Sequence, residues 1–249
     1  MIVGLWHPLH PTPNTHHLLV MRILTGTSGY SYKEWKGHFY PSDLKADEML
    51  RFYGERLKAV EINNTFYRMP REKVLLDWAA QVPDGFTFVL KASRRITHIK
   101  RLKEVGEEVR YLLQTANVLG RKLGPTLFQL PPNLKKDLPR LTDFLALIPK
   151  TWRAAMEFRH ESWFDDETFA ALRANDVALV YSDEAEEKEP SFVSTASWGY
   201  LRLRRGNYDL GEWARRVKAQ PWSDAFVFFK HEEAGAGPKM AAEFAALTA

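Results

Sequence analysis

The sequence predicts an α/β protein built as a (β/α)8 barrel of the TIM type, with parallel strands in a single domain. Eight short strand-like segments recur along the chain, amphipathic segments stand between most of them, and no break in composition divides the 249 residues. Alternating strands and helices are typical of parallel strands joined by right-handed crossovers. Eight such units in a chain of this length indicate closure into a barrel.

Each predicted strand is a short run rich in β-branched, aromatic and other apolar residues. The runs are RILTGTS (22–28), LKAVEIN (57–63), FTFVLKA (86–92), PTLFQL (125–130), RAAMEFR (153–159), VALVYS (177–182), GYLRLRR (199–205) and DAFVFFKH (224–231). A doubly wound open sheet is the alternative. No glycine-rich dinucleotide fingerprint follows any of these strands, because GTSGY has the wrong spacing.

Seven segments between or after the strands have apolar residues at helical spacing. They span 46–57, 71–82, 104–123, 137–148, 165–176, 209–220 and 238–249. An ideal barrel would have an eighth helix between the sixth and seventh strands. The sequence there, residues 183–198, has no apolar periodicity, and we expect a loop.

The first twenty residues differ from the rest. They lack Lys, Arg, Asp and Glu but hold three prolines and four of the eight histidines. We expect residues 1–20 to be a flexible tail, with an upstream start codon assigned in place of Met21, and residues 21–249 to form the barrel. They do not match a signal peptide, since a basic start and a continuous apolar stretch are missing.

Composition excludes several classes of function. The absence of cysteine excludes disulfides, thiolate metal sites and cysteine nucleophiles, and favours a cytoplasmic location. No apolar run approaches the roughly 20 residues that span a bilayer, so we expect no membrane association. The net charge of +4 permits an anionic partner without requiring one. The sequence leaves the oligomeric state open.

Every predicted strand ends in polar or ionisable residues. These are Thr27 and Ser28, Glu61 and Asn63, Lys91, Gln129, Glu157 and Arg159, Asp183, Arg202 and Arg204, and Lys230 with His231. Because barrel enzymes build their sites at the carboxyl ends of the strands, this pattern predicts a site at that mouth. The alternative is that polar residues merely mark strand ends and that Glu157 and Arg159 form a structural ion pair.

Two loops add aromatic rings and cations. GYSYKEWKGHFYP (29–41) contains five aromatic residues, too many for an ordinary solvated loop. The run 91–103 contains six cations and no acid; it is either a solvated face or a source of positive potential at the mouth.

Common catalytic motifs are missing from the sequence. There is no two-histidine zinc motif, no phosphate-binding glycine loop and no serine nucleophile elbow. No cofactor is required. Glu61, Glu157, Asp183 and His231 are residue types that can bind a divalent metal, but their spacing does not require one.

The ordered motifs resemble the domain of unknown function 72 family, also called YecE-like. The segments are GTSGYSYKEWKGHFYP, VEINNTFYRMP, FTFVLKASRRITH, LFQLPPNL, EFRHESW, YLRLR and FVFFKH, within residues 22–231. The resemblance implies a (β/α)8-type barrel but no established activity. The positions matching the family's pattern are Ser28, Tyr30, Trp35, Glu61, Asn63, Phe66, Tyr67, Lys91, Gln129, Pro131, Glu157, Arg159, Trp163 and Arg202. The family's last strand commonly ends in asparagines, whereas this chain has FFKHEE.

The leading hypothesis is a hydrolase or phosphodiesterase-like enzyme acting on a small anionic or phosphate-bearing substrate, with Glu61 and Glu157 as its general acid and base. The expected substrate-binding residues are Ser28, Tyr30, Trp35, Asn63, Tyr67, Lys91, Gln129, Arg159, Trp163 and Arg202. One alternative is a nucleic-acid-binding module that uses Arg94, Arg95, Lys100, Arg101 and Lys103. Another is a small-ligand binder without turnover.

Overall fold

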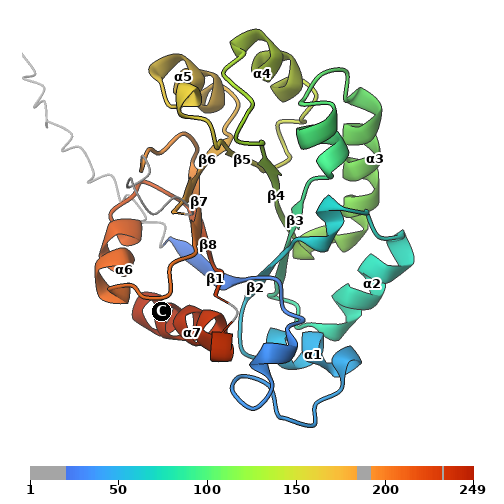
Figure 1. Cartoon of the computed structure of the whole chain (residues 1–249), viewed down its shortest axis with the longest axis vertical. Helices are drawn as coiled ribbons and strands as arrows, with labels where there is room; N and C mark the ends of the chain where they lie inside the picture. The colour runs from blue at the N-terminus through green and yellow to red at the C-terminus, as the bar shows by residue number, and fades with distance from the viewer. Residues whose placement is uncertain (1–20, 184–191, 232) are drawn as a thin grey trace, which may run out of the picture.

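The computed structural model describes residues 21–183, 192–231 and 233–249, in which eight parallel strands form a closed barrel. The strands are β1 (Arg22–Ser28), β2 (Ala59–Ile62), β3 (Thr87–Lys91), β4 (Leu123–Gln129), β5 (Ala154–Glu157), β6 (Ala178–Ser182), β7 (Trp198–Leu203) and β8 (Asp224–Phe229). Neighbours in sequence pair in order, and β8 pairs with β1 to close the ring, as Figure 1 shows down the barrel. The predicted (β/α)8 barrel is confirmed.

Seven α-helices surround the strands in the described part of the chain (Figure 1). They are α1 (Met49–Gly54), α2 (Glu72–Gln81), α3 (Gly106–Ala116), α4 (Leu138–Leu145), α5 (Asp166–Arg173), α6 (Leu210–Lys218) and α7 (Ala236–Thr248). Each lies within or overlaps one of the seven predicted segments. Between β6 and β7, residues 192–197 contain no helix, while residues 184–191 of the predicted loop lie outside the described residues, as does the predicted tail 1–20.

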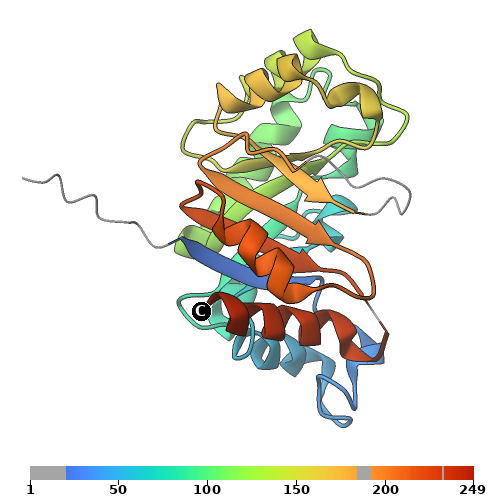
Figure 2. The same cartoon turned by 90° about the vertical axis from the view of Figure 1, so that its left-hand side faces the viewer.

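Short helical turns lie in the connections. The 3-10 turns are η1 (Lys33–Trp35), η2 (Ala46–Glu48), η3 (Asn64–Phe66), η5 (Asn117–Lys122), η6 (Glu161–Trp163) and η7 (Glu233–Gly235), and η4 (Arg95–Ile99) is a π-type turn. The turns η1, η3, η4, η6 and η7 follow the carboxyl ends of β1, β2, β3, β5 and β8. In Figure 2 the strand arrows point toward one end of the barrel, so these connections belong to the end where the site was predicted.

Three helices begin at an aspartate that caps the first turn. Asp137, Asp165 and Asp209 accept hydrogen bonds from the backbone N–H three residues later, at 3.1, 2.9 and 2.8 Å. These carboxylates satisfy N–H groups that have no partner within the helix and favour the positive end of its dipole. Local sequence therefore fixes where α4, α5 and α6 start.

The barrel interior is filled by its own apolar cluster. The cluster contains Leu24, Ala59, Val89, Leu127, Ala155, Ala178, Val180, Trp198, Tyr200, Phe226 and Phe228, which occupy alternate positions on the strands. The intervening residues pack outward against the helices in two larger clusters. Because side chains alternate along a strand, a residue two positions after a member of this interior cluster also points into the barrel.

Candidate functional site

A polar layer covers the interior cluster at the carboxyl ends of the strands. Each member lies two positions after an interior apolar residue, so strand alternation directs it inward: Glu61 follows Ala59, Lys91 follows Val89, Gln129 follows Leu127, Glu157 follows Ala155, and Arg202 follows Tyr200. The register places Gln129 beside Glu157 and Ser28 beside Glu61. The structure thus brings six of the predicted site residues into one layer.

Arg202 lies at the centre of this layer and bridges two carboxylates. Its Nη2 is 2.7 Å from Oε1 of Glu61, and its Nη1 is 2.6 Å from Oε2 of Glu157. All three side chains are at most 1% exposed. A buried charge is tolerated only where it is paired and hydrogen-bonded, and the two carboxylates meet this condition for the guanidinium.

The remaining carboxylate oxygens also have partners. The Tyr200 hydroxyl donates to Oε2 of Glu61 at 2.6 Å. Oε1 of Glu157 lies 2.5 Å from Nε of Arg159 and accepts a hydrogen bond from Gln129 Nε2 at 3.3 Å. All four oxygens are therefore engaged. The ion pair between Glu157 and Arg159, which the sequence offered as the structural alternative, is present.

This network keeps both carboxylates ionised. Burial raises the pKa of Glu61 and of Glu157, but the charge of Arg202 and the hydrogen bonds it donates outweigh burial, so that each pKa lies below its ordinary value and that of Glu157 falls to about 2. A general acid must carry a proton near neutral pH, and a base this weak accepts one poorly. The geometry therefore argues against the predicted acid–base pair.

Lys91 differs from the carboxylates because Nζ has no hydrogen bond or ion pair among the described residues. The ammonium lies 4.5 Å from the centre of the Phe66 ring, in a cation–π contact. Burial lowers the pKa of Lys91 most, the charge of Arg202 adds to the effect, and the result is about 8.

Positive charge exceeds negative charge at this mouth. Arg159 and Arg204 are partly exposed, and their charges interact with each other and with the Glu157–Arg202 pair. With Lys91 and Arg202 they make four cations facing the carboxylates of Glu61 and Glu157. A third acid, Asp183, accepts a hydrogen bond from the backbone N–H of Arg204 at 2.7 Å and another from the Tyr208 hydroxyl.

Two tryptophans predicted to bind substrate are instead packed in the core. Trp163 is 0% exposed, stacks on Phe158 and donates to the carbonyl oxygen of Leu134 at 2.8 Å. Trp35 is 1% exposed and packs with Phe39 and neighbouring tyrosines. Neither ring walls an open pocket, which corrects that expectation. Sequence alone cannot separate an aromatic residue that lines a cleft from one that fills the space under a loop.

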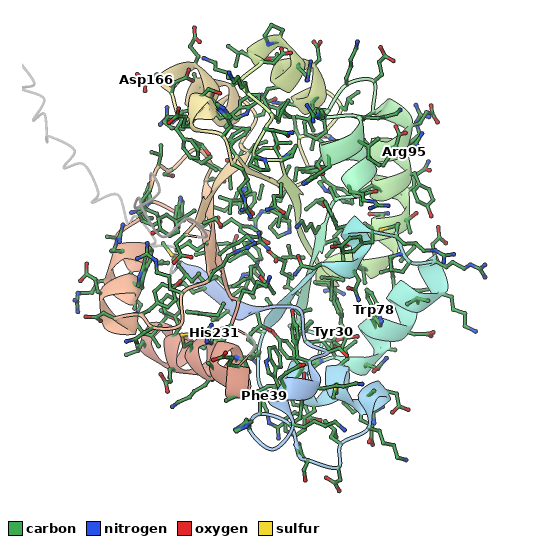
Figure 3. The ribbon with its side chains drawn as sticks, viewed as in Figure 1. Tyr30, Phe39, Trp78, Arg95, Asp166 and His231 are labelled. Carbon is green, nitrogen blue, oxygen red and sulfur yellow. The ribbon has the colours of Figure 1, made fainter. Side chains whose placement is uncertain are left out.

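Three other predicted binding residues lie around the mouth with different exposure. Tyr30 lies in the loop after β1, where Figure 3 labels it, and is partly buried, with its ring 6.3 Å from that of Tyr53. Asn63 is partly exposed and is the N-cap residue that precedes η3. Tyr67 is 69% exposed, and its ring packs edge-on against Phe66, the ring beneath Lys91.

The basic run 91–103 is partly neutralised by a residue outside it. Glu108 of α3 lies 2.7 Å from Arg95 Nε and 2.9 Å from Lys100 Nζ. Figure 3 shows Arg95 against α3, outside the ring of strands. Arg101 contacts the side-chain oxygen of Asn133 at 3.5 Å. The segment is therefore a less cationic surface than its sequence suggests. Arg94 and Lys103 are its exposed cations that have no ion pair among the described residues.

Sequence reasoning missed Tyr200 and the electrostatic importance of His98. Tyr200 could have been found, because it lies two positions before Arg202 and so shares its face. His98 packs edge-on against Phe66, and burial together with the charge of Lys91 lowers its pKa. No local sequence pattern indicated His98, because its contact with Phe66 exists only where the η3 and η4 turns meet.

Within the described residues, no group of three or more His, Cys, Asp or Glu side chains is arranged to hold a metal ion. Glu61, Glu157, Asp183 and His231, all within this part of the chain, therefore do not form such a group. No helix in the same residues has the length and apolar character needed to cross a bilayer.

The model of a family described as "Protein of unknown function DUF72" matches residues 24–249. The chain belongs to the DUF72 family. The UPF0759 protein YecE of Escherichia coli K12 is 31% identical over 116 residues, which cover 46% of this chain and 43% of YecE. The UPF0759 protein YunF of Bacillus subtilis is 25% identical over 216 residues, covering 80% of this chain and 77% of YunF. The match to YecE thus spans less than half of that relative.

Solved structures of DUF72 proteins have the same architecture. A member from Thermotoga maritima superposes with a TM-score of 0.79 at 25% identity, covering 91% of this chain and 98% of that one. A member from Enterococcus faecalis gives 0.72 at 20% identity, covering 91% and 94%. A fusion protein described as a xylose isomerase-like TIM barrel with 4-hydroxyphenylpyruvate dioxygenase gives 0.55 at 12% identity, covering 91% and 42%, which shows a shared fold alone.

Proposed function

We propose that the protein is a barrel enzyme that acts on a small anionic substrate, bearing a phosphate or carboxylate group, at the carboxyl-terminal mouth. The observation that carries this proposal is the excess of cations there, with Lys91, Arg159 and Arg204 next to the buried Glu61–Arg202–Glu157 bridge. Partly buried cations attract an anion more strongly than surface cations, because water screens them less. Arginine also suits these anions, since its planar fork donates two parallel hydrogen bonds.

The reaction expected from the sequence, hydrolysis of a phosphodiester or similar bond, depended on Glu61 and Glu157 as acid and base. Their pairing with Arg202 supports a positioning role for both instead. The proposal therefore keeps the anionic substrate but does not rest on that acid–base pair. Gln129 and Ser28, which flank the carboxylates in register, belong to the same layer.

The proposal is tested by isothermal titration calorimetry with inorganic phosphate, at low and at raised ionic strength. We expect Arg204→Met to weaken phosphate binding by about tenfold or more, because it removes a partly buried cation at the mouth. Arg205→Met is the matched control, since Arg205 is adjacent but has an exposed side chain. Equal affinity in all three proteins, or no binding by any, would contradict the proposal.

A nucleic-acid-binding role has one observation in its favour. The ring of Tyr67 is exposed, and the Arg94 guanidinium lies 6.0 Å from its centre. An aromatic surface on which a base could stack therefore lies beside a cation that could contact a phosphate. The neutralisation of Arg95 and Lys100 by Glu108 counts against it. Fluorescence anisotropy with a labelled single-stranded oligonucleotide distinguishes the two roles. Binding that falls steeply with salt and weakens in Arg94→Glu would favour the nucleic acid.

The third hypothesis, a ligand binder without turnover, predicts phosphate affinity with no reactive group at the mouth. The reactivity of Lys91 therefore distinguishes this hypothesis from the enzyme hypothesis.

A further inference from the structure

Lys91 is the group in the polar layer whose surroundings favour nucleophilic reactivity. It is the last residue of β3, on the inward face above Val89, and its side chain is partly exposed. The other charged members of the layer are engaged with each other. Nζ of Lys91 lies 4.5 Å from the centre of the Phe66 ring, and among the described residues no carboxylate lies within ion-pair distance of it.

The charged groups around Lys91 come from several strands. Burial opposes the protonated form of Lys91 most, and the charges of Arg202 and Arg204, from the β7 side, add to this effect. The charges of Glu61 of β2 and Glu157 of β5 favour the protonated form, but less strongly. Burial lowers the pKa of His98, on η4, and the charge of Lys91 adds to this effect, so the ring adds little positive charge near neutral pH. Lysine amines become nucleophilic near neutral pH when they are desolvated or lie close to another cation, and both conditions hold for Lys91.

We propose that Lys91 is a catalytic nucleophile that forms an imine with the carbonyl group of an anionic aldehyde or ketone. This rests on the proposed function, because the neighbouring arginines would hold the anionic group while the amine meets the carbonyl carbon. It adds the reacting group and narrows the substrate to carbonyl compounds.

The chemistry balances without a further reactant. The amine lone pair forms a C–N bond to the carbonyl carbon, the oxygen takes up protons, and the C–O bond then breaks with loss of water. Overall, a carbonyl compound and the lysine ammonium give a protonated imine and one water. The positive nitrogen then withdraws electrons from the carbon beside the former carbonyl, the property for which enzymes use such imines.

The test is reductive trapping with pyridoxal 5′-phosphate, an aldehyde that carries a phosphate. Protein and probe are mixed at pH 7.5, borohydride is added to reduce the imine to a stable secondary amine, and peptide mass spectrometry measures the label at each lysine. We expect Lys91 to be labelled about tenfold faster than Lys33, an exposed lysine in the loop after β1. Its initial rate should rise with pH and level off above pH 8, because the pKa of Lys91 is about 8.

Two controls separate this inference from the proposed function. Lys91→Arg should lose the fast label, and phosphate binding by the wild-type protein, measured separately by calorimetry, reports on the anion site alone. Pyridoxal, the analogue without phosphate, is largely closed to an internal hemiacetal, so the rate at Lys91 is divided by the rate at Lys33 for each probe. This ratio should be about tenfold lower with pyridoxal than with the phosphorylated probe. Equal ratios with both probes would remove anion recognition and leave Lys91 as a nucleophile. Labelling of Lys91 no faster than Lys33, with phosphate binding intact, would overturn the imine and leave the anion site.

Discussion

Arg202 is the side chain on which the polar layer depends most. Its guanidinium is buried between Glu61 and Glu157, which come from strands far apart in the ring. The charges of these carboxylates raise the pKa of Arg202 more than burial lowers it. Removing one partner of a buried ionic group costs more free energy than the pairing contributes, because the remaining charges stay buried without a counter-ion.

Arg202→Met should therefore lower the free energy of unfolding by about 3–5 kcal/mol, because two buried carboxylates lose their common counter-ion. Urea denaturation followed by circular dichroism measures this. Arg173→Met serves as the control, because Arg173 is exposed and has no ion pair among the described residues, which predicts a change within about 0.5 kcal/mol. Similar midpoints for both variants would mean that the bridge contributes little.

The contact between β1 and β2 requires a glycine. A Cβ at Gly26 would lie 1.8 Å from the carbonyl oxygen of Ala59 in β2. Above that point, the hydroxyl of Tyr53 accepts a hydrogen bond from the Thr27 N–H and donates to the Ala59 oxygen, both at 2.8 Å. The backbone atoms cannot move aside independently, because this hydrogen-bonded arrangement holds them.

Gly26→Ala should therefore destabilise the barrel by at least about 1–3 kcal/mol, the range for overpacked sites. Gly85→Ala is the matched control, since a Cβ there meets nothing within 4 Å. Thermal unfolding of the two variants measures the difference. A Gly26→Ala protein as stable as Gly85→Ala would show that β1 and β2 can separate without loss.

The polar layer couples the whole barrel to pH, because its ionised groups come from β2, β5 and β7. Glu157 has an ordinary pKa of 4.5 but a pKa of about 2 in the folded protein, where the charges of Arg202, Arg159 and Arg204 outweigh burial. The unfolded chain therefore takes up a proton at a higher pH than the folded chain. The stability that this difference provides is complete above pH 4.5 and is lost as the pH falls toward 2.

Acid should consequently lower the thermal unfolding midpoint between pH 4.5 and pH 2, and Glu157→Gln should flatten this dependence while lowering stability at pH 7. Differential scanning calorimetry across this pH range measures both effects. An unchanged slope in Glu157→Gln would assign the acid sensitivity to other carboxylates. Glu108, with a pKa of about 2 at the surface, is the first to replace next.

The barrel and the inward direction of its site residues were predictable from local patterns. Eight strand segments and seven helical segments were located correctly because alternation and helical periodicity are properties of neighbouring residues. The same alternation carried Glu61, Glu157 and Arg202 to one mouth, since parallel strands end at one edge. Trp35 and Trp163 were misplaced because an aromatic residue in a loop has no periodicity that reveals which side it buries.

Partners and protonation were decided only by the tertiary structure. Glu61 and Arg202 are 141 positions apart, and their contact exists because closure of the barrel brings β2 and β7 across one interior. Glu108 pairs with two cations of a segment to which it does not belong, because α3 packs beside η4. Local sequence thus determined the elements and the direction of their side chains, whereas charge state, which depends on burial and on distances between strands, could be read only from the closed barrel.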